Sequence, residues 1–152
     1  MEKIRSLAAA VLLFAVLYTG CGSRAQEETD GKEENKMQMN VQVGDSTFTA
    51  SLEENTAVDG LVEMMEQGPV TIRMRDYSGF EKVGSLGRSL PCDNRQTTTR
   101  SGDIVLYQGN QIVMFYGSNS WSYTRLGHID DLAGWEEALG SGDITATFSL
   151  ND

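Results

Sequence analysis

Histidine, cysteine and proline are scarce in this sequence, and each shortage argues against a class of protein. The 152 residues include one histidine, two cysteines and two prolines. One imidazole cannot supply a histidine-ligated metal site, and two cysteines cannot form the disulfide framework of a small secreted scaffold. Twelve lysines and arginines stand against 22 aspartates and glutamates, a net charge of −10. This acidity argues against nucleic acid as a partner, because phosphate backbones repel it.

Motifs for phosphate binding and for hydrolysis are also missing. The sequence contains no GxGxxG loop, no nucleophile elbow and no cluster of metal ligands. We therefore predict neither a cofactor nor a metal. Apolar residues make up 39% of the chain, which is of one-domain length, and its sixteen glycines indicate many turns. The composition thus predicts one folded domain with a hydrophobic core.

Residues 1–20 have the organisation of a secretory signal. Lys3 and Arg5 form a positive head, and an uncharged run follows over residues 6–20 with its apolar centre at residues 7–18. A membrane-spanning helix needs about 20 apolar residues. The shorter run seen here is typical of a signal peptide. We predict that residues 1–20 direct export and are then removed.

The end of this segment resembles the lipobox of bacterial lipoproteins. Residues 17–21 read Leu-Tyr-Thr-Gly-Cys, with small residues directly before Cys21. The resemblance implies cleavage before Cys21, attachment of diacylglycerol to its thiol, and a protein anchored to the outer face of the bacterial cell membrane. Tyr18 departs from the pattern, because these lipoproteins usually have leucine at that position. The alternative is an ordinary signal peptide that has Cys21 near its cleavage site.

Lipidation of Cys21 would leave Cys92 as the remaining thiol of an exported protein. Cys92 is then either a small, partly buried residue beside Pro91 or a reactive thiol. A reactive cysteine needs a nearby base, and the sequence places none beside it, since His128 lies 36 residues further on. The burial alternative is therefore favoured.

The segment after Cys21 differs in composition from the rest of the chain. Residues 24–36 read RAQEETDGKEENK, without one large apolar side chain. Such a segment buries too little surface to offset the entropy of ordering it. We predict that residues 21–36 form a lipidated cysteine and a flexible acidic tether, and that residues 37–152 form the folded domain. That domain holds seven basic against sixteen acidic residues, which disfavours direct contact with an anionic bilayer.

Alternating or continuous apolar runs within the domain predict eight strands. They lie at residues 37–43, 48–52, 70–75, 83–86, 103–108, 111–116, 126–129 and 144–150. Residues 87–101 and 117–124 lack a period and are predicted to be loops. This tally predicts a mainly β domain, an eight-stranded antiparallel barrel that is closed or nearly closed.

Two short helices are predicted between these strands, one over each opening of the barrel. Asn55 or Thr56 caps the first helix, and apolar residues recur along residues 58–65 at the spacing of one helical face. Asp131 caps the second helix, which has an apolar side formed by Leu132, Trp135 and Leu139.

The order of strands and helices resembles the cyclophilin fold, and most closely the small bacterial cyclophilin-like domain proteins. The resemblance extends over residues 37–150. The segments that support it are Asp-Tyr-Ser-Gly-Phe-Glu-Lys at 76–82, Leu-Gly-Arg-Ser-Leu-Pro at 86–91, Gly-Asp-Ile at 102–104 and Leu-Gly-His-Ile at 126–129. It implies a cyclophilin-like barrel with a binding groove on its surface.

The resemblance also implies candidate site residues. Cyclophilins are prolyl isomerases with a catalytic arginine in a Phe-His-Arg-x-x-Pro segment, onto which Arg88 falls, and their pocket glutamine falls on Gln96. The apolar proline pocket departs from the family, since Asp93 replaces an aromatic residue. Tyr123 replaces the pocket histidine, and Val113 falls on the pocket phenylalanine. Phe115 lies two residues further on the same strand, and Trp121 belongs to the loop of Tyr123.

These residues support three functional interpretations. The leading one is a binding module for a small ligand or a peptide, with a cleft built from Arg88, Gln96, Phe115, Trp121 and Tyr123. The alternative is a peptidyl-prolyl isomerase that acts on exported proteins, with Arg88 as its catalytic residue. The third is an interaction protein whose loop aromatics contact a protein partner. Each candidate also has a structural interpretation in place of a functional one. In this interpretation Arg88 forms a surface ion pair, Gln96 is a solvated side chain, and the aromatic residues pack onto the domain.

Overall fold

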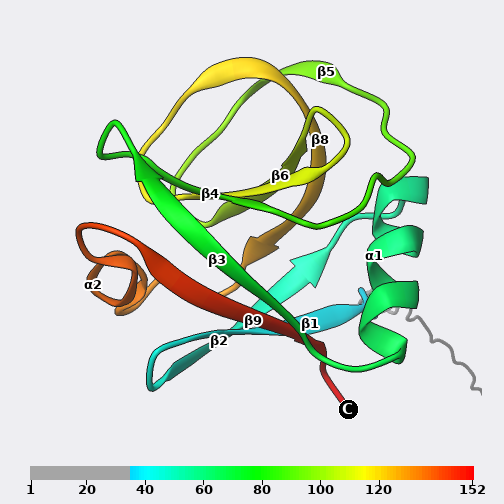
Figure 1. The fold of residues 1–152 in the computed structure, drawn as a ribbon, viewed down its shortest axis with the longest axis horizontal. Coiled ribbons are helices and arrows are strands. Elements are labelled where there is room, and N and C mark those ends of the chain that lie inside the picture. Colours follow the sequence, from blue (N-terminus) through cyan, green and yellow to red (C-terminus); the bar gives the residue numbers. More distant parts are fainter. Residues whose placement is uncertain (1–34) are drawn as a thin grey trace, which may run out of the picture. The chain divides into compact units, whose positions relative to one another are not determined.

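The computed structural model describes residues 35–152 (Figure 1). The predicted signal peptide, Cys21 and nearly all of the predicted tether lie outside these residues. The described part contains two helices, α1 (Thr56–Glu66) and α2 (Trp135–Leu139), and nine strands. The strands are β1 (Gln38–Val43), β2 (Ser46–Leu52), β3 (Val70–Tyr77), β4 (Glu81–Ser85), β5 (Arg95–Thr98), β6 (Asp103–Tyr107), β7 (Gln111–Phe115), β8 (Ser120–Ile129) and β9 (Ile144–Leu150). Neither helix is long and apolar enough to cross a membrane.

Eight of these strands close into an antiparallel barrel, which confirms the predicted fold class. The strand order is β2-β1-β9-β3-β4-β7-β6-β8, and β8 returns to β2 with Ala50 opposite Ile129. The ninth strand, β5, pairs only with the first part of β8 and extends the sheet beyond the barrel. This pair forms a two-stranded ribbon of residues 95–98 and 120–123, at the top of Figure 1. We call it the β5–β8 ribbon.

The barrel interior follows from alternation along the strands. In β1, Met39, Val41 and Val43 are buried while their neighbours are more exposed. Val41 lies opposite Phe48 of β2 and opposite Phe148 of β9, so each inward position packs on two others. This period of two is the pattern that predicts the strands from sequence.

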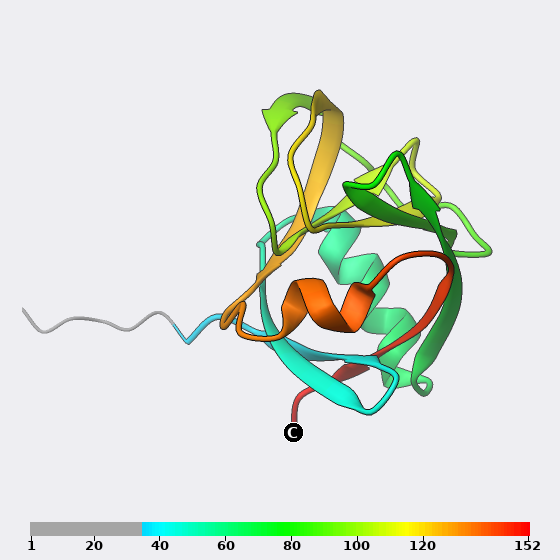
Figure 2. The same ribbon diagram turned by 90° about the vertical axis from the view of Figure 1, so that its left-hand side faces the viewer.

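The two helices lie at opposite openings of the barrel. Figure 2 shows α2 in front and α1 behind, with the strands around them. The Asn55 side chain accepts a hydrogen bond from the backbone N–H of Val58 at 2.9 Å, which confirms it as the N-cap of α1. Trp135 of α2 packs edge-on against Phe48 and donates its indole N–H to the backbone carbonyl of Phe115. Both helices therefore contribute to the interior core.

The prediction that Asp131 caps the second helix is wrong. Its carboxylate accepts a hydrogen bond from the backbone N–H of Ala133, two residues further on. The helix begins only at Trp135, after Gly134, which has a positive φ of 79° and no side chain with which to cap. Asp131 thus stabilises the turn before α2 and not the helix itself.

Both predicted loops contain strand residues. β5 lies within residues 87–101, and the first half of β8 lies within residues 117–124. The two segments pair with each other as the β5–β8 ribbon, and most of the ribbon's side chains are exposed. A strand that is solvated on both faces needs no apolar alternation. For this reason the sequence pattern gives no signal for it.

Strands β6 and β7 are buried on both faces, as their continuous apolar runs predict. Their inward residues join the interior core. Their outward residues Val105, Val113 and Phe115 form a second cluster together with Tyr123 of β8, and we call it the outer cluster. The outer cluster therefore lies on the outer face of the barrel wall, and the candidate site shares Val113 and Tyr123 with it.

Candidate functional site

The outer face of the barrel contains a cavity of about 540 Å³ that opens to solvent. We call it the outer-face cavity. Its lining comes from strands β3, β4, β6, β7 and β8 and from the turn before β8. The lining residues are Arg75, Asp76, Tyr77, Glu81, Val83, Tyr107, Gln111, Val113, Asn119, Trp121 and Tyr123. The cavity thus combines aromatic walls with a small number of charged and polar groups.

Strand register explains why these residues share one face. Tyr77 lies opposite Glu81 in the β3–β4 pair, and Glu81 lies opposite Phe115 in the β4–β7 pair. Two residues along each strand, Val83 lies opposite Val113. Because side chains alternate, the residues between them point into the barrel. The outer-face cavity is therefore a direct product of the barrel's strand pairing.

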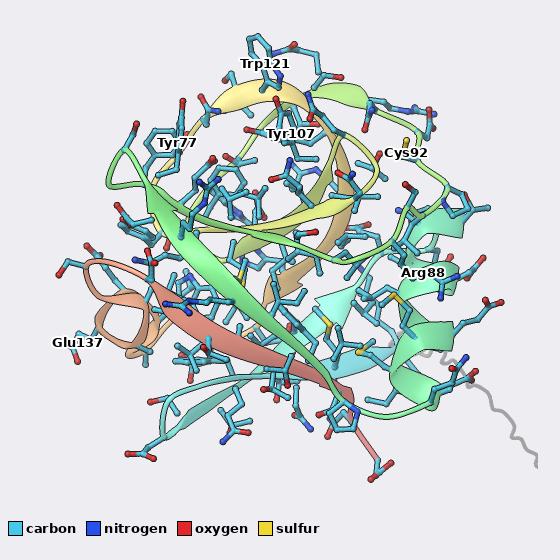
Figure 3. All side chains as sticks on the ribbon, viewed as in Figure 1. Tyr77, Arg88, Cys92, Tyr107, Trp121 and Glu137 are labelled. Carbon is cyan, nitrogen blue, oxygen red and sulfur yellow. The ribbon has the colours of Figure 1, made fainter. Side chains whose placement is uncertain are left out.

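Four aromatic side chains line the cavity and differ in exposure. Tyr77 is 58% exposed and Trp121 is 57% exposed, whereas Tyr123 is only 4% exposed. Tyr123 packs edge-on against Tyr107, with ring centroids 6.0 Å apart, and against Phe115 at 5.7 Å. Figure 3 shows Tyr77, Tyr107 and Trp121 at the same end of the molecule. Tyr107 and Tyr123 are thus held by packing, while Tyr77 and Trp121 present their rings to solvent.

The position of Trp121 depends on the β5–β8 ribbon, which Asn119 and Thr99 fix at its base. The Thr99 hydroxyl donates to the Asn119 carbonyl and accepts from the Asn119 backbone N–H, at 2.9 and 3.0 Å. The Asn119 side chain donates to the Tyr123 hydroxyl at 2.8 Å. Burial raises the pKa of Tyr123 above its ordinary value. Its hydroxyl therefore stays protonated and able to donate at neutral pH.

Glu81 is the unusual polar residue of the cavity. It is only 7% exposed, and its Oε2 is the one buried side-chain nitrogen or oxygen within residues 35–152 that has no hydrogen-bond partner. Burial raises the pKa of its carboxyl from an ordinary 4.5 to about 7. A buried acceptor without a partner costs free energy, and such groups occur where a ligand supplies the missing partner.

The other carboxylate of the cavity, Asp76, is already neutralised. It accepts hydrogen bonds from the Tyr116 hydroxyl and, at 3.0 Å, from the Lys82 ammonium. These bonds lower the pKa of Asp76, and burial together with Asp76 raises the pKa of Tyr116 to about 12. Lys82 is fully buried and also donates to the carbonyls of Gly140 and Gly142 at 2.9 and 2.6 Å. Lys82 therefore joins Asp76 to the chain after α2, and Glu81 remains the carboxyl with an unmet acceptor.

The structure brings only some of the candidates from the sequence together. Trp121 and Tyr123 line the cavity, and Phe115 lies buried against Tyr123. Gln96 lies on the β5–β8 ribbon opposite Ser122 and is not among the lining residues. Arg88 is exposed and lies beside α1, far from Tyr77 and Trp121 in Figure 3.

The path of the chain after β4 explains the position of Arg88. Leu86 and Leu90 donate their backbone N–H groups to the carbonyls of Asn110 and Gly109, in the turn between β6 and β7. Leu90 is buried and lies close to Gly60 of α1. These contacts carry the segment toward α1 and away from the outer-face cavity. The sequence predicts that Arg88 lies in one cleft with the aromatic residues, but the structure places Arg88 outside the cavity that Trp121 and Tyr123 line.

The sequence reasoning missed Arg75, Tyr77, Glu81, Tyr107 and Asn119 as residues of one cavity. Arg75 lies on the solvated face at the end of the predicted strand 70–75, and Tyr77 lies two residues beyond it. Nothing in the sequence says what these two residues face. Glu81 is followed directly by Lys82, and such a charged pair normally indicates an exposed turn. The predicted strands end at residue 75 and resume at residue 83, whereas β3 extends to Tyr77 and β4 begins at Glu81. This extension of the hairpin is what places Tyr77 opposite Glu81.

Cys92 and His128 lie outside the cavity. Cys92 is exposed, so the favoured prediction that it is partly buried is wrong. His128 bonds to the buried Asp103 at 2.8 Å, and Asp103 also forms an ion pair with Arg125. Residues 35–152 contain no group of three or more histidine, cysteine, aspartate or glutamate side chains placed to hold a metal.

Comparisons with known proteins agree with the architecture. The model of the cyclophilin-like family matches residues 41–149. The solution structure of a hypothetical protein from Archaeoglobus fulgidus superposes with a TM-score of 0.56 at 11% identity, over 76% of this chain and 95% of that one. That similarity shows the fold alone. No curated protein matches the sequence. Because the family model spans well over half of the chain, from β1 to β9, this protein belongs to the cyclophilin-like family.

Proposed function

We propose that this protein is a binding module, and that its outer-face cavity holds a small organic ligand or a side chain of a peptide. The observation that carries the proposal is the combination of four aromatic walls with a buried, unpartnered carboxyl in one open cavity. Ligand sites typically enclose about 300–1,000 Å³, are largely apolar, and hold a small number of placed polar groups. The outer-face cavity, at about 540 Å³, lies within this size range and combines aromatic walls with placed polar groups.

The exposure of two large aromatics supports binding over a purely structural role. Tyr77 and Trp121 expose more than half of their surfaces, although Tyr77 also packs edge-on against Phe80. When a ligand covers exposed aromatic rings beside a cavity, apolar surface is removed from water, and this favours binding of the ligand. The closed barrel holds Tyr123 and Glu81 in fixed positions, so that little order is lost on binding.

The isomerase alternative finds no supporting observation among the described residues. The resemblance to cyclophilins would place its chemistry on Arg88, and Arg88 does not line the cavity. A binding module that uses Glu81 and the aromatic side chains fits the geometry better. The protein-partner interpretation becomes the case in which a peptide side chain occupies the same cavity.

Calorimetric titration of the purified protein with indole and with 2-phenylethanol tests the proposal. Both probes are expected to bind, and Trp121→Ala is expected to weaken binding by about fivefold to tenfold through the loss of one apolar wall. Arg88→Ala serves as the matched control, since it removes an exposed side chain outside the cavity. Absence of binding for both probes, or loss of binding with Arg88→Ala but not with Trp121→Ala, would exclude the cavity as the site.

We also propose that Cys21 carries the lipid that anchors this module to the outer face of the membrane. The lipobox-like segment at residues 17–21 and the tether-like composition of residues 24–36 support this. Several acyl chains give stable anchoring, whereas one gives only marginal binding. Expression in a bacterium is expected to yield a membrane-bound chain that begins at Cys21 with added lipid mass, and Cys21→Ser is expected to lack that mass. An unmodified Cys21 in the mature wild-type protein would overturn the anchoring proposal.

A further inference from the structure

We infer that the outer-face cavity selects ligands that carry a protonated amine, held by the Glu81 carboxylate and faced by the rings of Tyr77, Tyr107 and Trp121. This inference rests on the proposed binding function and adds the chemistry of the ligand. It follows from the one unmet acceptor in the cavity, from the rings around it, and from the charges that share its walls.

The Glu81 carboxylate needs a donor from outside the protein. It is more than nine-tenths buried, it lines the cavity, and its Oε2 has no partner among the described residues. A carboxylate is an acceptor only, so its natural partner is a group that donates hydrogen bonds. A charged donor bonds it more strongly than a neutral one, because charge-assisted hydrogen bonds are about twice as strong.

Aromatic faces around a carboxylate favour an organic cation in particular. Tyr77, Tyr107 and Trp121 come from three different strands and line the same cavity (Figure 3). The electron-rich face of an aromatic ring attracts an ammonium group, and sites for alkylated amines are typically built from several such rings. The rings also take up the apolar body of the ligand, so the cavity suits a cationic head on an apolar group.

The other charged and titratable groups around Glu81 are compatible with a cation. On β3, Asp76 is neutralised by Lys82 and Tyr116, and Lys82 points to the other face of β4. On β6 and β8, the titratable residues that line the cavity are Tyr107 and Tyr123, and burial raises the pKa of Tyr123. The domain as a whole is strongly acidic, which raises the local concentration of cations.

Arg75 is the one group in the cavity that opposes a cation. It lies opposite Val83, so it is a diagonal neighbour of Glu81, about 7–8 Å away along the sheet. It forms no ion pair with Glu81, and burial is the cause of the raised pKa of Glu81, with no offset from a neighbouring charge. Both side chains line the same cavity, so a ligand head bonded to Glu81 would lie within reach of the Arg75 charge. Removal of the Arg75 charge is expected to strengthen cation binding.

Titration with three probes of similar shape tests the inference. They are phenethylammonium, the neutral 2-phenylethanol and the anionic 3-phenylpropanoate. At about pH 8, where Glu81 is ionised, phenethylammonium is expected to bind about tenfold tighter than 2-phenylethanol. At about pH 5.5 that advantage is expected to disappear, because Glu81 then holds a proton while an alkylamine, with a pKa of about 10, keeps its charge. The wild-type protein alone gives this result, so it does not depend on the folding of a variant.

Two substitutions complete the experiment. Glu81→Gln is expected to abolish the preference for the ammonium probe, so that the ammonium and neutral probes bind with similar affinity at every pH. Arg75→Gln is expected to increase ammonium affinity by about threefold. Equal binding of the ammonium and neutral probes, or strongest binding of the carboxylate probe, overturns the inference and leaves the proposed function standing. If none of the three probes binds, the inference fails, and the proposed function fails with it when indole does not bind either.

Discussion

Glu81 and Lys82 are neighbours in β4 and both are buried, yet they lie on opposite faces of the strand and meet opposite environments. Lys82 turns inward, where three oxygen atoms, from Asp76, Gly140 and Gly142, accept its hydrogen bonds. Glu81 turns outward into the cavity, where no group of the described residues donates a hydrogen bond to its Oε2. Lys82 is thus bonded within the fold, whereas Glu81 keeps the unmet acceptor that the proposed ligand would pair with.

The raised pKa of Glu81 predicts a specific dependence of stability on pH. Its carboxyl has a pKa of about 7 in the folded protein against an ordinary 4.5. Between these values the folded state holds a proton that the unfolded state has lost, so this group's contribution to the free energy of unfolding falls as pH rises through that window. The cavity admits solvent, so we expect a loss of about 1–2 kcal/mol between about pH 4.5 and pH 8.

Glu81→Gln removes this titration and provides the comparison. Urea unfolding is expected to show that the wild type loses about 1–2 kcal/mol more than the variant over the same pH range. The variant is thus expected to gain relative stability at high pH. Parallel pH profiles for the two proteins would show that Glu81 titrates as an ordinary exposed carboxyl.

Lys82→Met is expected to destabilise the fold. The substitution keeps much of the side-chain volume but removes the partner of Asp76 and of two backbone carbonyls. Breaking a buried ion pair costs about 3–5 kcal/mol, and since Asp76 is partly exposed we expect about 3 kcal/mol in urea unfolding. The matched control is Arg95→Ala, which breaks the exposed Arg95–Asp93 pair and is expected to cost less than about 0.5 kcal/mol. Similar losses for both would refute the anchoring role of Lys82.

The two tryptophans are expected to respond differently to substitution. Trp121 is more than half exposed, whereas Trp135 is 1% exposed and packs on Phe48. We expect Trp135→Ala to cost about 3–5 kcal/mol of stability and Trp121→Ala less than about 1 kcal/mol. Acrylamide quenching of the wild-type fluorescence is expected to come chiefly from Trp121. A large stability loss with Trp121→Ala would mean that this ring serves the fold and not a ligand.

Gly84→Ala tests the close approach of β3 and β4 in the barrel wall. An added Cβ would lie 2.5 Å from Ile72 Cγ2 and 2.7 Å from the Arg73 carbonyl oxygen. The backbone oxygen cannot move aside without loss of pairing, so we expect a cost of about 2 kcal/mol or more in thermal or urea unfolding. Ser85→Ala at the neighbouring exposed position is expected to change stability by less than about 0.5 kcal/mol.

The barrel could be predicted from sequence because its strands alternate or run continuously apolar. Met39, Val41 and Val43 show the period directly, and the β6–β7 hairpin shows burial on both faces. The β5–β8 ribbon could not be predicted, because its threonines and serines are solvated on both sides and give no period.

The candidate site could be predicted only in part, for reasons of packing. Trp121 and Tyr123 stood out as aromatics in a polar segment, and both line the cavity. Arg88 aligns with the catalytic arginine of cyclophilins, but Leu90 is buried near α1 and holds the segment of Arg88 there, away from the cavity. Glu81 could not be distinguished from an exposed charge, since its burial depends on strands far away in sequence.

The central claim is that ligands bind in the outer-face cavity, and chemical-shift mapping of the isotope-labelled protein during titration with phenethylammonium tests it most directly. The account predicts that the largest backbone amide shifts fall on Tyr77, Glu81, Trp121 and Tyr123, and that they saturate together. Residues around Arg88 are expected to stay unchanged. Shifts centred on Arg88 and α1, or no saturable shifts at the cavity, would contradict the account.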